Sequence, residues 1–100
     1  MDEQEQIVIN LIVNSGSARS SAIEAIQYAK AGDLDKADES LQTAKETVNE
    51  AHHAQTELIQ AEIRGEKAPL NLLMVHAQDH YMTSQLAKDL IEALIYCLDK

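Results

Sequence analysis

The stretch from Lys30 to Ala37, KAGDLDKA, decides how the chain folds. Gly32 follows a long run of helix-forming residues, and glycine readily takes the left-handed backbone conformation that ends a helix. Asp33 comes next, and its carboxylate is suited to cap the first turn of a new helix. One helix therefore ends and another begins within a few residues. Because so short a connection leaves no room for a crossover, we predict that the two helices are antiparallel neighbours.

A second stretch with the same character runs from Arg64 to Asn71, RGEKAPLN. Gly65 is a second stop, and Pro69 fits just inside or before the first turn of a further helix. We see no alternation of apolar and polar residues that would predict a strand. The sequence therefore predicts an all-α fold, an antiparallel up-and-down three-helix bundle formed by a single domain over residues 1–100. The expected helices cover residues 4–31, 34–64 and 69–99.

The second helix has the clearest periodic pattern. Its stripe repeats at alternating spacings of three and four, which is typical of a helix with one face in a bundle. The stripe consists of Leu34, Ala37, Leu41, Ala44, Val48, Ala51, Gln55 and Leu58. In the first helix the small residues Asn14 to Ser20, NSGSARS, indicate close packing by another helix. They also leave open a second interpretation, a site wall from which Arg19 reaches an anion.

The third helix carries two apolar stripes, and a three-helix bundle buries only one of them. The first stripe is Leu73, Ala77, His80, Ser84, Ala87, Ile91, Leu94 and Leu98. The second is Leu72, Val75, Asp79, Met82, Leu86, and Leu90 or Ala93. We expect the same helix of other subunits to cover the second stripe. This predicts an oligomer with the third helix at its centre.

The composition excludes some classes of partner. Eight basic and 17 acidic residues give a formal net charge of −9, which argues against binding to nucleic acid or to an anionic membrane surface. The N-terminus is acidic, unlike a signal peptide, and no apolar run approaches the roughly 20 residues that span a bilayer. The single cysteine, Cys97, allows no internal disulfide and should pack in the core. We therefore expect a cytoplasmic protein.

The segment from Val75 to Thr83, VHAQDHYMT, concentrates the reactive side chains. His76 and His80 lie one turn apart on one helix face, while Asp79 falls on the second stripe. Three interpretations are open: two histidines and a carboxylate that ligate a divalent metal, an imidazole that accepts a phosphoryl group, or polar groups satisfied within a helix interface. No glycine-rich phosphate loop is present, so a phosphoryl group has to come from another protein.

A metal site built by one chain has weaker support. Glu50 and His53 form a Glu-x-x-His pair like those of di-iron helical bundles, but that class needs two such pairs and further glutamates. The sequence holds one pair and no HExxH pattern. His52 and His53 are more simply read as solvated or half-buried residues of the second helix.

The chain resembles the lactose/cellobiose-type enzyme IIA proteins of the phosphoenolpyruvate-dependent sugar phosphotransferase system. The resemblance runs nearly end to end, through INLIVNSGSARSSAIEAI (residues 9–26), GDLDKADESLQTAKETVNEAHHAQTELI (residues 32–59) and VHAQDHYMTSQLAKDLIEALI (residues 75–95). The last segment is the most specific and looks closer to the cellobiose/diacetylchitobiose branch than to the lactose branch. Tyr81 stands where relatives are expected to have Leu, and Ala77 where lactose-type members tend to have Gly. Neither change removes a reactive group.

The resemblance implies a phosphocarrier. In this family phosphoryl passes from HPr to the first histidine of an H-x-Q-D-H motif, here His76, and then to a cysteine of enzyme IIB during uptake of a β-linked disaccharide through the membrane enzyme IIC. Gln78 and His80 are candidate helpers for the phosphoryl group. Val75, Tyr81 and Met82, together with residues of the first helix, would contribute a docking face for the two partner proteins.

The resemblance also implies a homotrimer of three-helix bundles. The aspartate of the motif, Asp79, would lie at the trimer axis and bind a structural Mg²⁺ there. Two other classes compete with the carrier. One is a structural or adaptor helical bundle without phosphotransfer, and the other is a histidine phosphotransfer domain of two-component signalling, which usually has four helices.

Overall fold

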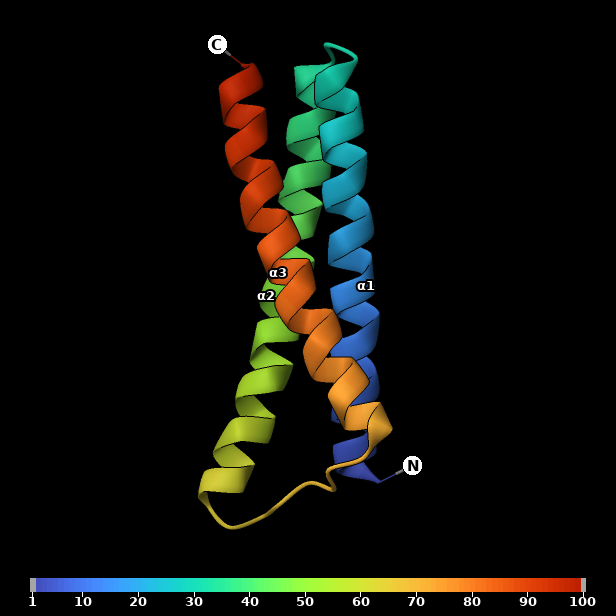
Figure 1. Cartoon of the computed structure of the whole chain (residues 1–100), viewed down its shortest axis with the longest axis vertical. Helices are drawn as coiled ribbons and strands as arrows, with labels where there is room; N and C mark the ends of the chain where they lie inside the picture. The colour runs from blue at the N-terminus through green and yellow to red at the C-terminus, as the bar shows by residue number, and fades with distance from the viewer. Residues whose placement is uncertain (1, 100) are drawn as a thin grey trace.

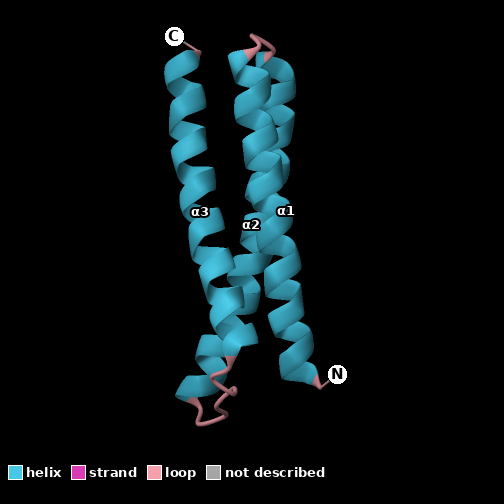
Figure 2. Cartoon of the chain, turned by 45° about the vertical axis from the view of Figure 1, so that its right-hand side comes forward, coloured by secondary structure: helices cyan, strands magenta, loops and turns pink. Residues whose placement is uncertain are grey.

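Three long helices make up the described part of the chain, residues 2–99 of the computed structural model. They are α1 (Glu3–Lys30), α2 (Leu34–Ile63) and α3 (Leu72–Leu98). Figure 1 shows α2 running antiparallel to α1, and α3 returning in the direction of α1. Residues 2–99 contain no strand (Figure 2). The bundle measures 49 × 22 × 19 Å, and the all-α up-and-down prediction is confirmed.

The two glycine stops predicted from the sequence are where the helices end. Gly32 and Gly65 have φ angles of 85° and 89°, the left-handed conformation that costs glycine little. The carboxylate of Asp33 accepts a hydrogen bond from the backbone N–H of Lys36 at 3.1 Å, which satisfies a donor at the start of α2. The short connection therefore folds as the sequence predicts.

The start of α3 differs from the prediction. The helix was expected from residue 69 but begins at Leu72, so Pro69 lies in the connection. The cause is Asn71, whose backbone is extended and whose side-chain oxygen accepts from the N–H of Met74 at 2.9 Å. Asparagine is among the best N-caps, and it sets the boundary in place of the proline. The other helix limits lie within one residue of those expected.

The core is built from small side chains at alternating spacings of three and four. Within α1 the buried set is Val8, Leu11, Ser15, Ala18, Ala22, Ala25 and Ala29. The predicted stripe of α2 is buried except at Leu34 and Gln55, which are half-buried. Alanine and serine let helix axes approach to the short end of the usual range, about 8 Å. The close packing expected around Asn14 to Ser20 is confirmed, because Ser15 and Ala18 are fully buried.

The buried face of α3 is rotated from the one predicted. Leu94 and Leu98 are each 53% exposed, and Ile95 is buried in their place. The rotation follows from Tyr81, which is only 4% exposed and packs in the core cluster that contains Val48. Since neighbouring helix positions are about 100° apart, burying Tyr81 turns its neighbour His80 toward the edge of the core.

Two smaller predictions are wrong for the same reason. Tyr81 does not contribute to an exposed docking face, because its ring fills the core. Cys97 is exposed, because it lies two positions beyond the buried Ile95 and so points away from α1 and α2.

The second apolar stripe of α3 is uncovered in the single chain, as the sequence predicts. Its large residues are each more than half exposed: Leu72, Val75, Met82, Leu86 and Leu90. Monomeric proteins rarely expose so continuous an apolar surface, so this face indicates an interface. Among the described residues, no helix is long and apolar enough to cross a membrane.

Candidate functional site

His76 and His80 form a ring pair on α3. Their ring centroids are 4.9 Å apart and their planes are inclined by 47°. His76 is exposed to solvent, whereas His80 is half-buried against α1. The i, i+4 spacing predicted this pairing. Of the two imidazoles, His76 is therefore the one that a second protein can reach.

The first helix forms a wall behind His80. The guanidinium of Arg19 lies with Nη2 at 3.5 Å from Nε2 of His80. A Cβ atom placed on Gly16 would be 3.8 Å from the same nitrogen, an ordinary van der Waals contact, so Gly16 lies where α1 approaches the ring. Since arginine has only donors, Nε2 of His80 must be the acceptor in this contact, and the proton of the neutral ring is on Nδ1.

The environment of His80 favours the neutral imidazole. Burial lowers the pKa of His80 below its ordinary value, and electrostatic interactions with Arg19 and the neighbouring imidazole lower it further. The nearby carboxylate of Asp79 acts in the opposite direction but is the weakest of these influences. A lowered pKa keeps the ring uncharged near neutral pH, so His80 does not add a second positive charge beside Arg19.

Gln78 lies on a different side of α3. Its side-chain oxygen accepts a hydrogen bond from the amide of Gln55 on α2 at 2.9 Å. Its own amide group donates to the sulfur of Met74 at 3.5 Å. The structure thus brings His80, but not Gln78, next to His76.

Asp79 lies about 60° around α3 from His76. Its side chain is exposed, and along the helix it stands between the exposed apolar residues Val75 and Met82. Within residues 2–99, no group of three or more His, Cys, Asp or Glu side chains is arranged to hold a metal ion. One chain therefore offers a single carboxylate at this position, and a metal there requires the same residue from other copies.

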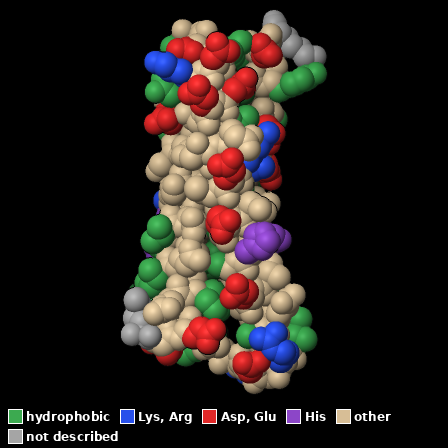
Figure 3. Space-filling view, turned by 180° about the vertical axis from the view of Figure 1, so that it is seen from behind, with side chains coloured by type: hydrophobic (Ala, Val, Ile, Leu, Met, Phe, Trp, Pro, Cys, Tyr) green, Lys and Arg blue, Asp and Glu red, His purple; other side chains and the backbone are tan. Residues whose placement is uncertain are grey.

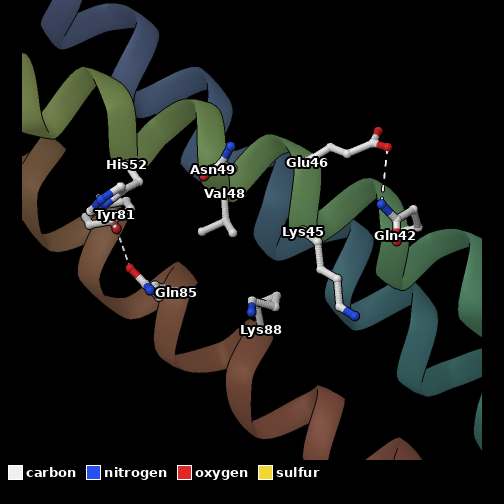
Figure 4. Close-up of a pocket in the computed structure, with 9 residues that line it drawn as sticks. All are labelled: Gln42, Lys45, Glu46, Val48, Asn49, His52, Tyr81, Gln85 and Lys88. Carbon is white, nitrogen blue, oxygen red and sulfur yellow. Dashed lines mark hydrogen bonds between the residues drawn. The ribbon is translucent and has the colours of Figure 1, made fainter.

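A polar groove separates α2 from α3 farther along the bundle (Figure 4). It has a volume of about 450 Å³ and contains a chain of hydrogen bonds in which His52 Nδ1 lies 2.9 Å from the hydroxyl of Tyr81, which donates to Gln85. Its two lysines are already paired, Lys45 with Glu92 at 2.9 Å and Lys88 with neighbouring acids. These internal pairs leave the groove with little unsatisfied charge.

Two side-chain contacts could not be predicted from the sequence. His52 and Tyr81 are 29 positions apart and Arg19 and His80 are 61 apart, so no local spacing signals either pair. For Arg19 the only hint was its position among small residues, which allowed a site wall. The structure confirms the close packing and places Arg19 beside His80, while its contact with an anion stays a prediction.

Known proteins place these features in a family. Residues 6–99 match the family described as PTS system, Lactose/Cellobiose specific IIA subunit. The chain is 50% identical over 99 residues to the lichenan-specific phosphotransferase enzyme IIA component of Bacillus subtilis, covering 99% of this chain and 90% of that protein. The fold is similar to the crystal structure of the PTS cellobiose-specific enzyme IIA from Bacillus anthracis, with a TM-score of 0.93, 52% identity, and 99% and 91% of the two chains covered.

A third relative was solved together with another protein. It is the IIA(chitobiose) chain in solution structures of the IIA(chitobiose)–HPr complex from the N,N'-diacetylchitobiose branch of the Escherichia coli phosphotransferase system. Its TM-score is 0.81 at 42% identity, with 99% of this chain and 96% of that chain covered. These relatives confirm the resemblance to the cellobiose/diacetylchitobiose branch. The chain belongs to the lactose/cellobiose-specific IIA family and is a phosphotransferase component of a sugar phosphotransferase system.

Proposed function

We propose that this chain is a phosphocarrier that accepts a phosphoryl group from phospho-HPr on His76 and passes it to the cysteine of enzyme IIB. The observation that carries the proposal is an exposed imidazole, His76, beside a second imidazole that stays neutral, His80. A relative in the same family was solved as a complex with HPr, which supports HPr as the donor. The single cysteine of this chain is consistent with the reducing cytoplasm in which we expect the exchange to occur.

The chemistry requires little beyond positioning and charge neutralisation. A ring nitrogen of neutral His76 uses its lone pair to form a new N–P bond, while the N–P bond to the donor histidine breaks and its electron pair stays on the donor ring. In the second transfer, a thiolate of enzyme IIB attacks the same phosphorus and His76 leaves as neutral imidazole. His80 lies beside the accepting ring, with 4.9 Å between the ring centroids, and is the candidate helper for the phosphoryl oxygens.

The substrate class follows from the relatives rather than from this chain. They are named for lichenan, cellobiose and N,N'-diacetylchitobiose, so we infer that the system takes up a β-linked disaccharide through its membrane enzyme IIC. The competing function is an adaptor bundle, in which both histidines serve only to make contacts within the fold.

Incubating the chain with phosphoenolpyruvate, enzyme I and HPr separates these functions. We expect intact mass spectrometry to detect one added phosphoryl group per chain, lost again in acid, because an N–P bond to imidazole is acid-labile. Omitting HPr should prevent the gain. A chain that stays unmodified in the complete mixture would exclude the carrier and leave the adaptor.

We further propose a homotrimer that buries the second apolar stripe of α3 around a threefold axis. Three copies of Asp79 would then meet within an apolar surface, where three unpaired carboxylates repel one another. A divalent cation such as Mg²⁺, bound by these three carboxylates, would neutralise the charge and fix the register of the helices. The role of the ion is structural, and no step of the transfer depends on it.

Asp79→Leu tests the metal proposal. We expect the bound metal, measured by elemental analysis of the purified protein, to fall from one ion per trimer to none. The melting temperature of the variant should no longer respond to EDTA, whereas that of the wild type should decrease. Phosphorylation of His76 should persist, because leucine only extends the apolar stripe. Asp38→Leu, at an exposed position of α2, is the matched control, and equal metal content in both variants would contradict the axial site.

A further inference from the structure

Arg19 is a half-buried cation to which the described structure gives no acidic partner. Within residues 2–99 the ion pairs involve Lys45, Arg64 and Lys88, each bound to an aspartate or glutamate. Arg19 instead contacts a ring nitrogen of His80. Acidic side chains outnumber basic ones by 17 to 8 in this sequence and are spread along the visible face in Figure 3. Although acidic side chains are abundant, none of those described pairs with Arg19, so its guanidinium is available to bind another anion.

The surroundings of Arg19 leave its charge uncompensated. His80 accepts a hydrogen bond from the guanidinium, but an imidazole carries no negative charge in either of its protonation states and so supplies no counter-charge. Partial removal from water weakens the solvation of the guanidinium without replacing it by a counter-charge. Such a group binds an arriving anion more strongly than a fully solvated arginine does.

The position of Arg19 indicates which anion it meets. Nη2 of Arg19 is 3.5 Å from Nε2 of His80, and the His80 ring lies beside the accepting ring of His76, with 4.9 Å between centroids. We propose that Arg19 binds the phosphoryl group carried on His76, as a catalytic residue contributed by α1. This inference rests on the phosphocarrier function proposed above, and it adds a charge-neutralising residue to that function.

The chemistry of the guanidinium suits this role. It is planar, stays protonated, and presents paired N–H donors that match two oxygens of a phosphoryl group. During transfer the N–P bond to HPr breaks as the N–P bond to His76 forms, and Arg19 neither gains nor loses a proton. Its hydrogen bonds move from Nε2 of His80 to the phosphoryl oxygens, so His80 holds the arginine in place until the anion arrives.

The experiment compares Arg19→Gln and Arg19→Lys with Arg64→Gln. Arg64 is exposed at the end of α2 and paired with Glu66, so Arg64→Gln removes the same charge away from the histidines. The equilibrium of phosphoryl exchange with phospho-HPr and the half-life of the isolated phosphoprotein are measured. We expect Arg19→Gln to reduce the equilibrium constant about 10- to 100-fold, the range for losing a hydrogen bond to a charged group. Arg19→Lys should be intermediate and Arg64→Gln unchanged.

Two further measurements separate a phosphoryl contact from support of the fold. The ³¹P chemical shift of the phosphohistidine should change in Arg19→Gln and Arg19→Lys but not in Arg64→Gln. In a His80→Gln background, replacing Arg19 by glutamine should still lower the equilibrium constant, because the arginine acts on the phosphoryl group directly. If Arg19→Gln no longer lowered the equilibrium constant in that background, Arg19 would act only by positioning His80, and the inference would be overturned.

The possible failures are distinguishable. If the wild type accepts no phosphoryl group, the proposed carrier function is wrong. If the wild type accepts it and Arg19→Gln matches it in equilibrium, half-life and ³¹P shift, the carrier stands and the role of Arg19 is wrong. If Arg19→Gln does not fold, Arg19→Lys decides the question, because lysine keeps the charge but loses the paired donors. An unaltered ³¹P shift and half-life in that variant would overturn the inference.

Discussion

Replacing His76 by glutamine is expected to abolish phosphoryl acceptance completely. Glutamine keeps a polar side chain of similar length, but its amide nitrogen has no free lone pair with which to attack phosphorus. In the assay with phosphoenolpyruvate, enzyme I and HPr, the intact mass of the variant should stay unchanged. The melting temperature should stay close to that of the wild type, because the His76 side chain is exposed and outside the core.

His53→Gln is the matched control for this variant. His53 is also an exposed histidine, on α2, and its ring contacts that of His52. The same substitution there should leave phosphorylation intact. If His76→Gln still accepted a phosphoryl group, or if His53→Gln lost this ability, the assignment of phosphorylation to His76 would be wrong.

Leu86→Lys is expected to convert the trimer to monomers. Leu86 is 58% exposed in the single chain and lies on the second apolar stripe, two turns beyond Asp79. Burying a leucine contributes about 1.5–3 kcal/mol, so three copies lose that stabilisation in each trimer. The substitution also brings three unpaired ammonium groups to one apolar seam, and each would have to be desolvated without a counter-charge.

Light scattering coupled to size-exclusion chromatography measures this effect. The wild type should elute at three times the 11.1 kDa mass of the chain, and Leu86→Lys at the mass of one chain. Ile63→Lys is the matched control, because Ile63 is 79% exposed at the end of α2 and lies outside the stripe. A Leu86→Lys protein that remains trimeric would show that α3 is not at the centre of the assembly.

The fold could be predicted from the sequence where the relevant physics is local. Gly32, Gly65 and Asp33 act within one turn of their own positions, so their residue types alone located the helix ends. Asn71 obeys the same local rule, but Pro69 two positions earlier offered a competing start. The stripe on α2 could be predicted equally well, because its apolar residues repeat at alternating spacings of three and four.

The face of α3 could not be predicted in the same way. This helix is apolar on two sides, so periodicity alone did not decide whether Tyr81 or His80 faces the core. The choice depends on packing against Val48 and its neighbours on α2, which is a tertiary property. The candidate site was also only partly predictable. The pairing of His76 with His80 follows from their local spacing, whereas the position of Arg19 depends on how α1 packs against α3.

The placement of His76 and Asp79 about 60° apart on one rigid helix also limits how the chain can change in length. One residue inserted between them would rotate the histidine by about 100° relative to the carboxylate and carry it out of reach of a docking protein. The connection from Arg64 to Asn71 lies outside helical register and tolerates additional residues far better. Natural length variation among such carriers should therefore collect in that connection and spare the segment from His76 to Asp79.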